Sequence, residues 1–218
     1  YSYQGEINES NNVALAGAVT LVAPNLAVTS ISTASPSVIL NGPFTVNWTV
    51  ANQEPAAARN QWSDAVYVSR LPTFDNSARY LTNRYTGSYA DRPPLDGSGG
   101  VHPSYNASLS VTLPSDLGTG TFYLYVKADY YNEQGETSES DNVSAPLQLA
   151  VSAPDLVAEN VTLGAASAVL SGPLSVSWTV RNQGAVQAPA QWYDTVYFSR
   201  NQTFDGTARA VTVRYSST

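Results

Sequence analysis

The 218-residue sequence contains no cysteine and no methionine, and it has one histidine and one lysine. Without cysteine there are no disulfides, so stability must come from a hydrophobic core or from bound metal ions. No apolar run approaches the ~18 residues that indicate a membrane-spanning helix. We therefore expect no membrane insertion of this segment.

Basic side chains are scarce as well. Lysine and arginine number 10 against 17 acidic residues, which gives a net charge of −7 and a pI near 4.5. Nucleic acids require a basic footprint and anionic membranes a polybasic segment, so neither is expected as a partner. Charged residues make up only 12% of the chain. The abundant β-branched and aromatic residues predict an all-β fold.

The chain repeats itself at an offset of 130 residues. Residues 1–88 align with residues 131–218 without an insertion, and 37 of the 88 positions are identical. Agreement is strongest in residues 42–85, where 24 of 44 positions match and where Trp48 and Trp62 align with Trp178 and Trp192. Self-similarity at a fixed period indicates a repeat architecture.

This alignment divides the chain into three parts. Residues 1–23 are the C-terminal end of a preceding repeat, residues 24–153 are a complete repeat, and residues 154–218 are the N-terminal half of a following repeat. A repeat of about 130 residues is long enough to bury its own core. Because two of the parts are incomplete, we expect the chain to be a piece of a longer protein.

The complete repeat is predicted to contain seven short strands separated by Gly, Pro, Asn and Asp. In residues 44–50 every second residue is apolar, so these apolar side chains share one face. Strands of this length and spacing predict an antiparallel β-sandwich. The expected strands are residues 26–31, 44–50, 62–69, 79–85, 109–113, 122–128 and 147–151, of which 79–85 is expected at a sheet edge.

The joints between repeats are short. Ala23-Pro24 and Ala153-Pro154 stand where one repeat gives way to the next. Proline stiffens such a joint, and the few residues available cannot act as a flexible linker. We therefore expect a rod of stacked modules.

The four tryptophans are the residues expected to pack between the two sheets. Trp48 and Trp178 lie in strands of period two, and we assign them to the core. Trp62 and Trp192 follow a variable loop, so they are either core residues or exposed aromatics that bind a ligand.

Two pairs of aspartates that recur with the scaffold are assigned structural roles. Asp64 and Asp194 lie on the apolar side of their strands and require buried partners such as backbone amides or the Asn52 side chain. Asp75 and Asp205 follow Thr-Phe in both copies and are expected to hydrogen-bond the next backbone amides in a turn.

An acidic loop, residues 129–142, is the sharpest candidate site. It holds five of the chain's acidic residues between two strands, and calcium takes six to eight oxygen ligands of the kind it supplies. The alternative is a solvated loop whose Glu139 and Asn142 bond neighbouring backbone. Calcium is the one candidate cofactor, and its candidate ligands are Asp129, Glu136, Glu139, Asp141, Asn142, Glu6 and Glu9.

The one long irregular segment, residues 86–104, is the candidate binding loop. Binding residues are often placed on long loops of a rigid sandwich, although a mobile insertion would give the same pattern. Its candidate residues are Tyr89, Asp91, Arg92, Asp96 and His102. His102 has no counterpart in the repeat and lies among Gly and Pro, so we expect a surface histidine and no enzyme.

The chain resembles the bacterial cell-adhesion-related domain, CARDB, in tandem. The opening motif of that family is matched by residues 154–156, 170–172, 177–184 and 192–199, and its closing motif by residues 120–124, 128–129, 136, 139–142 and 146–147. The resemblance implies tandem immunoglobulin-like sandwiches in a large secreted or surface protein. The family has no catalytic residues to carry over.

The leading hypothesis is a non-enzymatic repeat segment of a large bacterial cell-surface or extracellular protein that acts as an adhesive or spacer rod. The alternative is a structural subunit of an extracellular filament or sheath, assembled end to end by neighbouring modules. The expected partners are adjacent repeats of the same polypeptide or neighbouring copies, and a surface glycan or protein as ligand. Residues 154–218 lack the counterparts of 89–130, so we expect further polypeptide or a neighbouring molecule to complete them.

Overall fold

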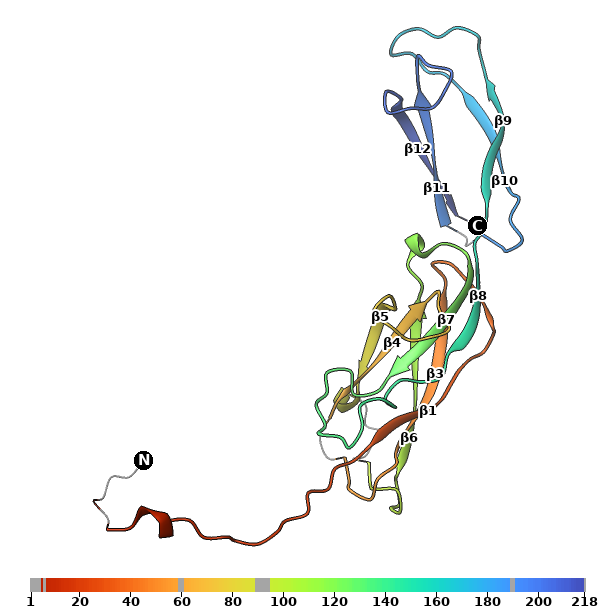
Figure 1. The fold of residues 1–218 in the computed structure, drawn as a ribbon. Helices are drawn as coiled ribbons and strands as arrows, with labels where there is room; N and C mark the ends of the chain where they lie inside the picture. The colour runs from red at the N-terminus through yellow and green to blue at the C-terminus, as the bar shows by residue number, and fades with distance from the viewer. Residues whose placement is uncertain (1–4, 6, 59–60, 89–94, 189–190, 218) are drawn as a thin grey trace.

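The computed structural model describes residues 5, 7–58, 61–88, 95–188 and 191–217. Figure 1 shows an extended N-terminal segment, a two-sheet unit and a smaller four-stranded unit. Helix within the described ranges is limited to three 3-10 turns, and none of it is long and apolar enough to cross a membrane. The expected all-β class is confirmed. The turns are η1 (Glu9–Asn11), η2 (Thr86–Ser88) and η3 (Ser115–Leu117).

The two-sheet unit has eight strands, one more than the sequence predicts. The unpredicted strand is β2, which has three residues and pairs in parallel with β8. The full set is β1 (Leu26–Thr33), β2 (Ser37–Ile39), β3 (Pro43–Asn52), β4 (Ser63–Ser69), β5 (Arg79–Tyr85), β6 (Ser104–Thr112), β7 (Gly120–Lys127) and β8 (Leu147–Ser152).

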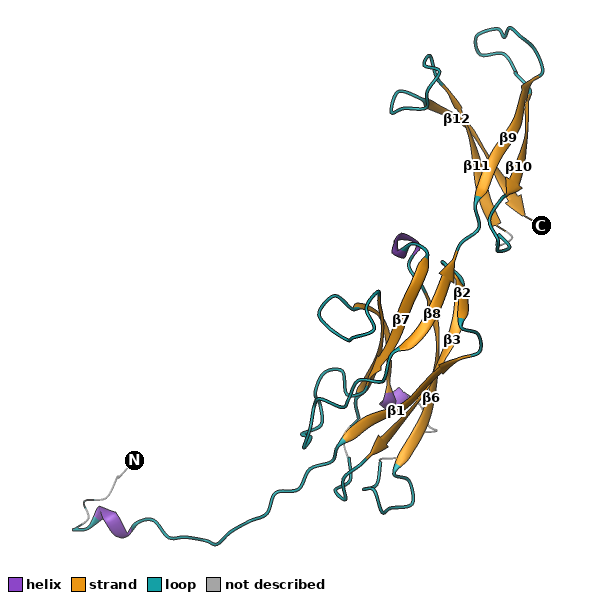
Figure 2. Cartoon of the chain, turned by 45° about the vertical axis from the view of Figure 1, so that its right-hand side comes forward, coloured by secondary structure: helices purple, strands orange, loops and turns teal. Residues whose placement is uncertain are grey.

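These strands form two sheets that pack face to face, as Figure 2 shows. One sheet has the order β1-β3-β6, and the other has the order β2-β8-β7-β4-β5. The pairings are antiparallel except for β2 with β8. β5 lies at a sheet edge, as its sequence predicts. The unit is therefore a β-sandwich.

The core lies between the sheets because the inner face of each strand is apolar. On β3, Val46, Trp48 and Val50 are buried and Phe44 packs against them. The alternation of residues 44–50 thus gives one buried face, as predicted. The opposite sheet contributes a matching set of buried side chains: Val66, Val68, Phe122, Leu124, Val126 and Leu149.

The smaller unit consists of two antiparallel strand pairs, β9 with β10 and β11 with β12. Its pairing follows that of the sandwich at the offset of 130, since Leu26 faces Asn52 and Leu156 faces Asn182. The bulge recurs too: the register of β4 with β5 shifts after Val66, and that of β11 with β12 shifts after Val196. The strands are β9 (Leu156–Leu163), β10 (Val176–Asn182), β11 (Gln191–Phe198) and β12 (Arg209–Ser217).

Two strand edges differ between the units. In the sandwich, β3 pairs with both β1 and β6, and β4 pairs with both β5 and β7. In the described part of the smaller unit, β10 pairs only with β9 and β11 only with β12. The cores of the two units therefore differ in how completely they are covered.

The joint between the units is short. Residues 153–155 alone separate the end of β8 from the start of β9. Backbone bonds hold it on both sides, from Leu40 N to Ser152 O at 2.8 Å and from Gln183 N to Asp155 O at 2.8 Å. At the other end of the sandwich, residues 10–22 are largely exposed and form no strand. The division at residues 23 and 153 stays a prediction.

Candidate functional site

A buried carboxylate joins the two sheets of the sandwich. Asp64 on β4 is fully buried, and its Oδ2 accepts a hydrogen bond of 2.8 Å from Nε1 of Trp48 on the opposite sheet. Its Oδ1 accepts a bond of 3.0 Å from Nε1 of Trp62, and the hydroxyl of Tyr105 on β6 donates to Oδ2. Donors from both sheets thus satisfy the buried oxygens. We call these four residues the indole–carboxylate cluster.

Burial raises the pKa of Asp64 to about 6. The three hydrogen bonds and the positive charge of Arg84 act in the opposite direction, because they stabilise the ionised form. The effect of desolvation on the pKa is larger than that of the hydrogen bonds and of Arg84, because no atom of the Asp64 side chain reaches solvent. The hydrogen bonds of the cluster therefore connect the two sheets.

The partners of Asp64 differ from those that the sequence suggested. Among the residues that the structure describes, neither a backbone amide nor Asn52 bonds its carboxylate. Asn52 instead accepts a bond of 3.0 Å from Asn25 N and donates one of 2.6 Å to Ala56 O. Asp64 thus has buried partners, as expected, but the two suggested kinds were wrong, because Asn52 lies at the end of β3 and bonds residues 25 and 56.

The same pair recurs in the smaller unit. Nε1 of Trp178 donates a bond of 3.1 Å to Oδ2 of Asp194. Trp178, Trp192 and Asp194 are each only partly buried, whereas Trp48, Trp62 and Asp64 are buried. The indole Nε1 of Trp192 is buried and has no hydrogen-bond partner among the described residues.

The acidic loop is organised by its own carboxylates. Asp129 is fully buried, and its two oxygens accept bonds of 2.8 Å from Glu133 N and Gln134 N. Nδ2 of Asn142 lies between two further carboxylates, 3.2 Å from Glu136 Oε1 and 3.0 Å from Glu139 Oε2. The amide therefore separates two groups that would otherwise repel each other.

The acidic loop also holds the start of β1. Oε2 of Glu136 accepts a hydrogen bond from Leu26 N, and Oδ2 of Asp141 accepts one of 2.8 Å from Nδ2 of Asn25. Thr137 N donates to Pro24 O at 3.0 Å. The acidic loop therefore bonds residues 24–26, where the chain enters the sandwich.

Calcium at this loop stays a prediction. Glu6 and the side chain of Glu9 lie outside the described residues. In the ranges that are described, no three histidine, cysteine, aspartate or glutamate side chains are arranged to hold a metal ion. Burial and the charges of Glu139 and Asp129 raise the pKa of Glu136 to about 7, against the bonds from Leu26 and Asn142. Hydrogen bonds alone account for the geometry seen.

The candidate binding loop is only partly described. Tyr89, Asp91 and Arg92 lie outside the described residues. Oδ2 of Asp96 accepts bonds from the backbone N of Val101 and of His102, and the imidazole of His102 lies 3.8 Å from it on the surface. The part that the structure describes is therefore a closed turn.

The turn aspartates take their expected places. Oδ1 of Asp75 accepts a bond of 2.8 Å from Ser77 N, and Oδ1 of Asp205 accepts one of 2.9 Å from Thr207 N. The hydroxyl groups of Ser77 and Thr207 also donate to these oxygens, and the hydroxyl bonds, together with the amide bonds, lower the pKa of both carboxyls. Both residues stabilise the turn between two paired strands.

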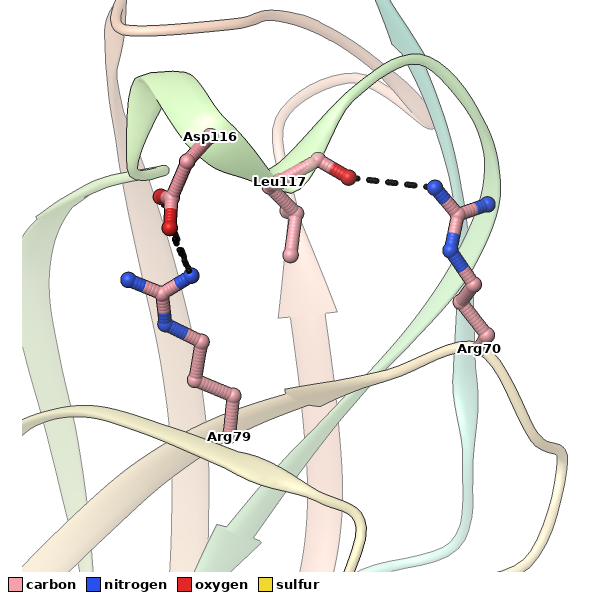
Figure 3. Close-up of polar contacts among 4 residues, drawn as sticks. All are labelled: Arg70, Arg79, Asp116 and Leu117. Carbon is pink, nitrogen blue, oxygen red and sulfur yellow. Dashed lines mark hydrogen bonds and ion pairs between the residues drawn. The ribbon is translucent and has the colours of Figure 1, made fainter.

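Two arginines that sequence reasoning missed hold the loop between β6 and β7 (Figure 3). Nη2 of Arg70 donates to Leu117 O at 3.0 Å, and its guanidinium lies 4.3 Å from the centroid of the Phe122 ring. Arg79 bonds both carboxylate oxygens of Asp116 at 3.0 Å. The sequence did carry a sign of this structural role, because both arginines recur at the offset of 130, as Arg200 and Arg209.

Sequence reasoning also missed an aromatic cluster on the outer face of the larger sheet. Tyr67 packs edge-on against Phe74, with ring centroids 5.1 Å apart, and Tyr80 stacks on Tyr130 at 5.7 Å. The first pair recurs as Tyr197 and Phe204 at 4.9 Å. Phe74 and Tyr80 are exposed, so part of the cluster faces solvent.

Comparison with known proteins gives matches among solved structures alone. No family model matches the sequence, and no curated protein matches it either. Among solved structures, a crystal structure of the CARDB domain of the PF1109 protein from Pyrococcus furiosus, in complex with di-metal ions, is 18% identical with a TM-score of 0.41. That match covers 62% of this chain and 94% of the CARDB domain.

Two further structures show how distant these likenesses are. A solution structure of the same CARDB domain is 19% identical with a TM-score of 0.42, and covers 60% of this chain and 97% of its own. A β-glucosidase from Listeria innocua is 13% identical with a TM-score of 0.34, covering 59% of this chain and 16% of the enzyme. The sandwich assignment rests on the strand order and the core described above.

Proposed function

We propose that this chain is a non-enzymatic segment of a large bacterial cell-surface or extracellular protein, built from tandem immunoglobulin-like sandwich modules of the CARDB type. The modules act together as a spacer or adhesive rod. One observation carries the proposal: strand register, bulge position and the indole–carboxylate pair recur at an offset of 130 on either side of a three-residue joint.

The short joint between the two units supports a role as a spacer. A linker of 153–155 that contains Pro154 and is hydrogen-bonded at Ser152 and Asp155 has little freedom to bend. The acidic loop adds three bonds to the joint at the opposite end of the sandwich. A stiff joint transmits direction from one module to the next, which is what a spacer requires.

The outer aromatic cluster supports an adhesive role. Large exposed rings with hydroxyl groups are the residues most enriched where proteins meet partners. Tyr67 and Phe74 recur as Tyr197 and Phe204, so a rod would present them at each module. A surface glycan or a protein is the class of ligand that suits such a face.

A filament or sheath subunit is the second candidate. No described strand covers the second edge of β10 or of β11, and this favours it, because an open edge can pair with another chain. Electron microscopy of the parent protein distinguishes the two: isolated rods of uniform width support the spacer, and regular helical fibres support the filament.

A further inference from the structure

One asparagine side chain holds the start of the smaller unit. Oδ1 of Asn182, the last residue of β10, accepts hydrogen bonds of 3.0 Å from Asp155 N and from Gly184 N. Its Nδ2 donates a bond of 2.7 Å to Val186 O. This side chain therefore ties the joint, residues 153–155, to the loop that follows β10.

The next residue, Gln183, adds two further bonds to the joint. Gln183 N donates to Asp155 O at 2.8 Å, and Nε2 of Gln183 donates to Oδ2 of Asp155, also at 2.8 Å. Asp155 is thus held through its backbone N, its backbone O and its carboxylate. The loop also packs closely here, since a side chain at position 184 would place its Cβ 2.7 Å from Asp155 N and 3.2 Å from Ala153 O.

The same arrangement recurs where the chain enters the sandwich. Oδ1 of Asn52 accepts bonds from Asn25 N at 3.0 Å and from Glu54 N at 3.3 Å. Nδ2 of Asn52 donates to Ala56 O at 2.6 Å, and Gln53 N donates to Asn25 O at 2.8 Å. In both copies the asparagine stands 27 residues after the residue whose backbone N it bonds. The bonds are therefore a property of the repeat.

The glutamine side chain meets a different group in each copy. Nε2 of Gln183 donates to the carboxylate of Asp155, whereas Oε1 of Gln53 accepts a bond of 3.5 Å from Nδ2 of Asn25. A glutamine amide can make either bond because it carries both a donor and an acceptor. A glutamate at position 183 would instead place one carboxylate against another, and the two would repel each other.

Little freedom is left between the bonded residues of the joint. On the sandwich side, Leu40 N donates to Ser152 O at 2.8 Å. Only Ala153 and Pro154 separate Ser152 from Asp155. The proline ring fixes its own φ, and the residue before a proline is restricted to extended conformations. A large change in the direction of the smaller unit therefore requires that bonds at Ser152 or Asp155 break.

We propose that Asn182 and Gln183 are positioning residues that fix the direction of the smaller unit relative to the sandwich, and that Asn52 and Gln53 hold the entry to the sandwich in the same way. Each module then carries the side chains that stiffen its own joint. This inference rests on the proposed function, because it assigns the residues that give a spacer its stiff joint.

Nitrogen-15 relaxation of the backbone amides in the full chain tests the inference, because it gives a rotational correlation time for each unit. With a stiff joint the two units tumble as one body, so β4 and β11 should give the same correlation time. We expect Asn182→Ala to shorten the correlation time of the smaller unit by about a third, since the joint loses a bond at Asp155 and the loop after β10 loses its ties. A purely local role of Asn182 would not change this quantity.

A change of charge tests the same contact without removing Asn182. In Gln183→Glu the carboxylates at positions 183 and 155 repel each other, so the smaller unit should again tumble separately. Adding Asp155→Asn to that variant pairs a carboxylate with an amide, and the single correlation time should return. The matched control is Gln53→Glu, which faces Asn25 at the other end of the sandwich and should leave both correlation times as in the parent.

The outcomes separate the inference from the proposed function. A parent chain whose two units already tumble independently contradicts the spacer role itself. If the parent tumbles as one body and both Asn182→Ala and Gln183→Glu still do so, the inference is overturned while the stiff joint stands. Where Asn182→Ala unfolds the smaller unit, Gln183→Glu and its rescue by Asp155→Asn decide: loosening with rescue supports the inference, and loosening without rescue contradicts it.

Discussion

The indole Nε1 of Trp48 lies 2.8 Å from Oδ2 of Asp64, and this contact joins strands of opposite sheets. A sandwich without disulfides must fix the relation of its two sheets by packing and by such polar contacts. Here one carboxylate on β4 accepts hydrogen bonds from two indoles and a phenol, which come from two strands and a loop. The indole–carboxylate cluster therefore links the two sheets, and two of its four members, Asp64 and Tyr105, can be tested by near-isosteric change.

Asp64→Asn should destabilise the sandwich. The asparagine NH₂ would face N–H and O–H donors where the carboxylate now accepts, so buried donors lose their partners. We expect the free energy of unfolding in urea to fall by about 2–4 kcal/mol. The matched control is Asp75→Asn on the surface turn, which should change it little; equal effects of the two changes would contradict the role of Asp64.

Stability should depend on pH through Asp64. Its pKa is about 6 in the folded protein, above the ordinary value of 3.8. The stabilisation from its neutral form is therefore fully present below pH ~4 and is lost as pH rises through 6, by about 3 kcal/mol in total for a shift of this size. Arg84 and Tyr105 are the other ionisable groups that face it.

The pH effect can be isolated by difference. The free energy of unfolding is measured from pH 4 to 7 for the parent and for Asp64→Asn, and the asparagine curve is subtracted. Other acidic groups titrate in both proteins and cancel. We expect the difference to decline between pH 4 and 6; a flat difference would mean that Asp64 titrates normally.

The sequence predicted most strands because their apolar residues alternate, as in β3. It placed the start of β6 five residues too late, since Ser104-Tyr105-Asn106 follows a Gly- and Pro-rich loop and gives too short a pattern. It missed β2 because three residues show no periodicity. Pairing of such a strand with β8 depends on residues over 100 positions away.

The sites were harder to predict than the strands. Repetition correctly marked Asp64 as a residue with a structural environment, but Tyr105 stands 41 residues away in a strand that the chain contains once. No local pattern connects the two. Likewise, Glu136 and Leu26 N form a hydrogen bond although they lie 110 residues apart in the sequence. The contact between the acidic loop and the start of β1 could therefore be found only from the fold.

The two arginines near η3 should differ in effect. Arg70→Ala removes a ring contact with Phe122 as well as a bond to Leu117 O, and should lower stability by about 1 kcal/mol. Arg79→Ala removes an exposed ion pair and should lower it by about 0.5 kcal/mol or less. Urea unfolding compares them, with Arg70→Lys as an intermediate case. A larger effect at Arg79 would contradict the geometry.

The acidic loop gives a test of calcium. If calcium binds there, 100-fold excess over its dissociation constant should stabilise the protein by about 2.7 kcal/mol and raise its melting temperature. Glu139→Gln with Asp141→Asn should abolish the response. A melting temperature that is the same in excess calcium and in a chelator would show that the hydrogen bonds of Asn142 and Asn25 suffice.

The stiffness of the joint at residues 153–155 is the central claim, and the absence of cysteine allows it to be measured cleanly. Spin labels on Asn76→Cys and Gly206→Cys, at equivalent exposed turns of the two units, report their separation by pulsed electron paramagnetic resonance. We expect a single narrow distance distribution that broadens when four Gly-Ser residues are inserted after Ala153. A distribution that is already broad, and that the insertion leaves unchanged, would contradict a rod.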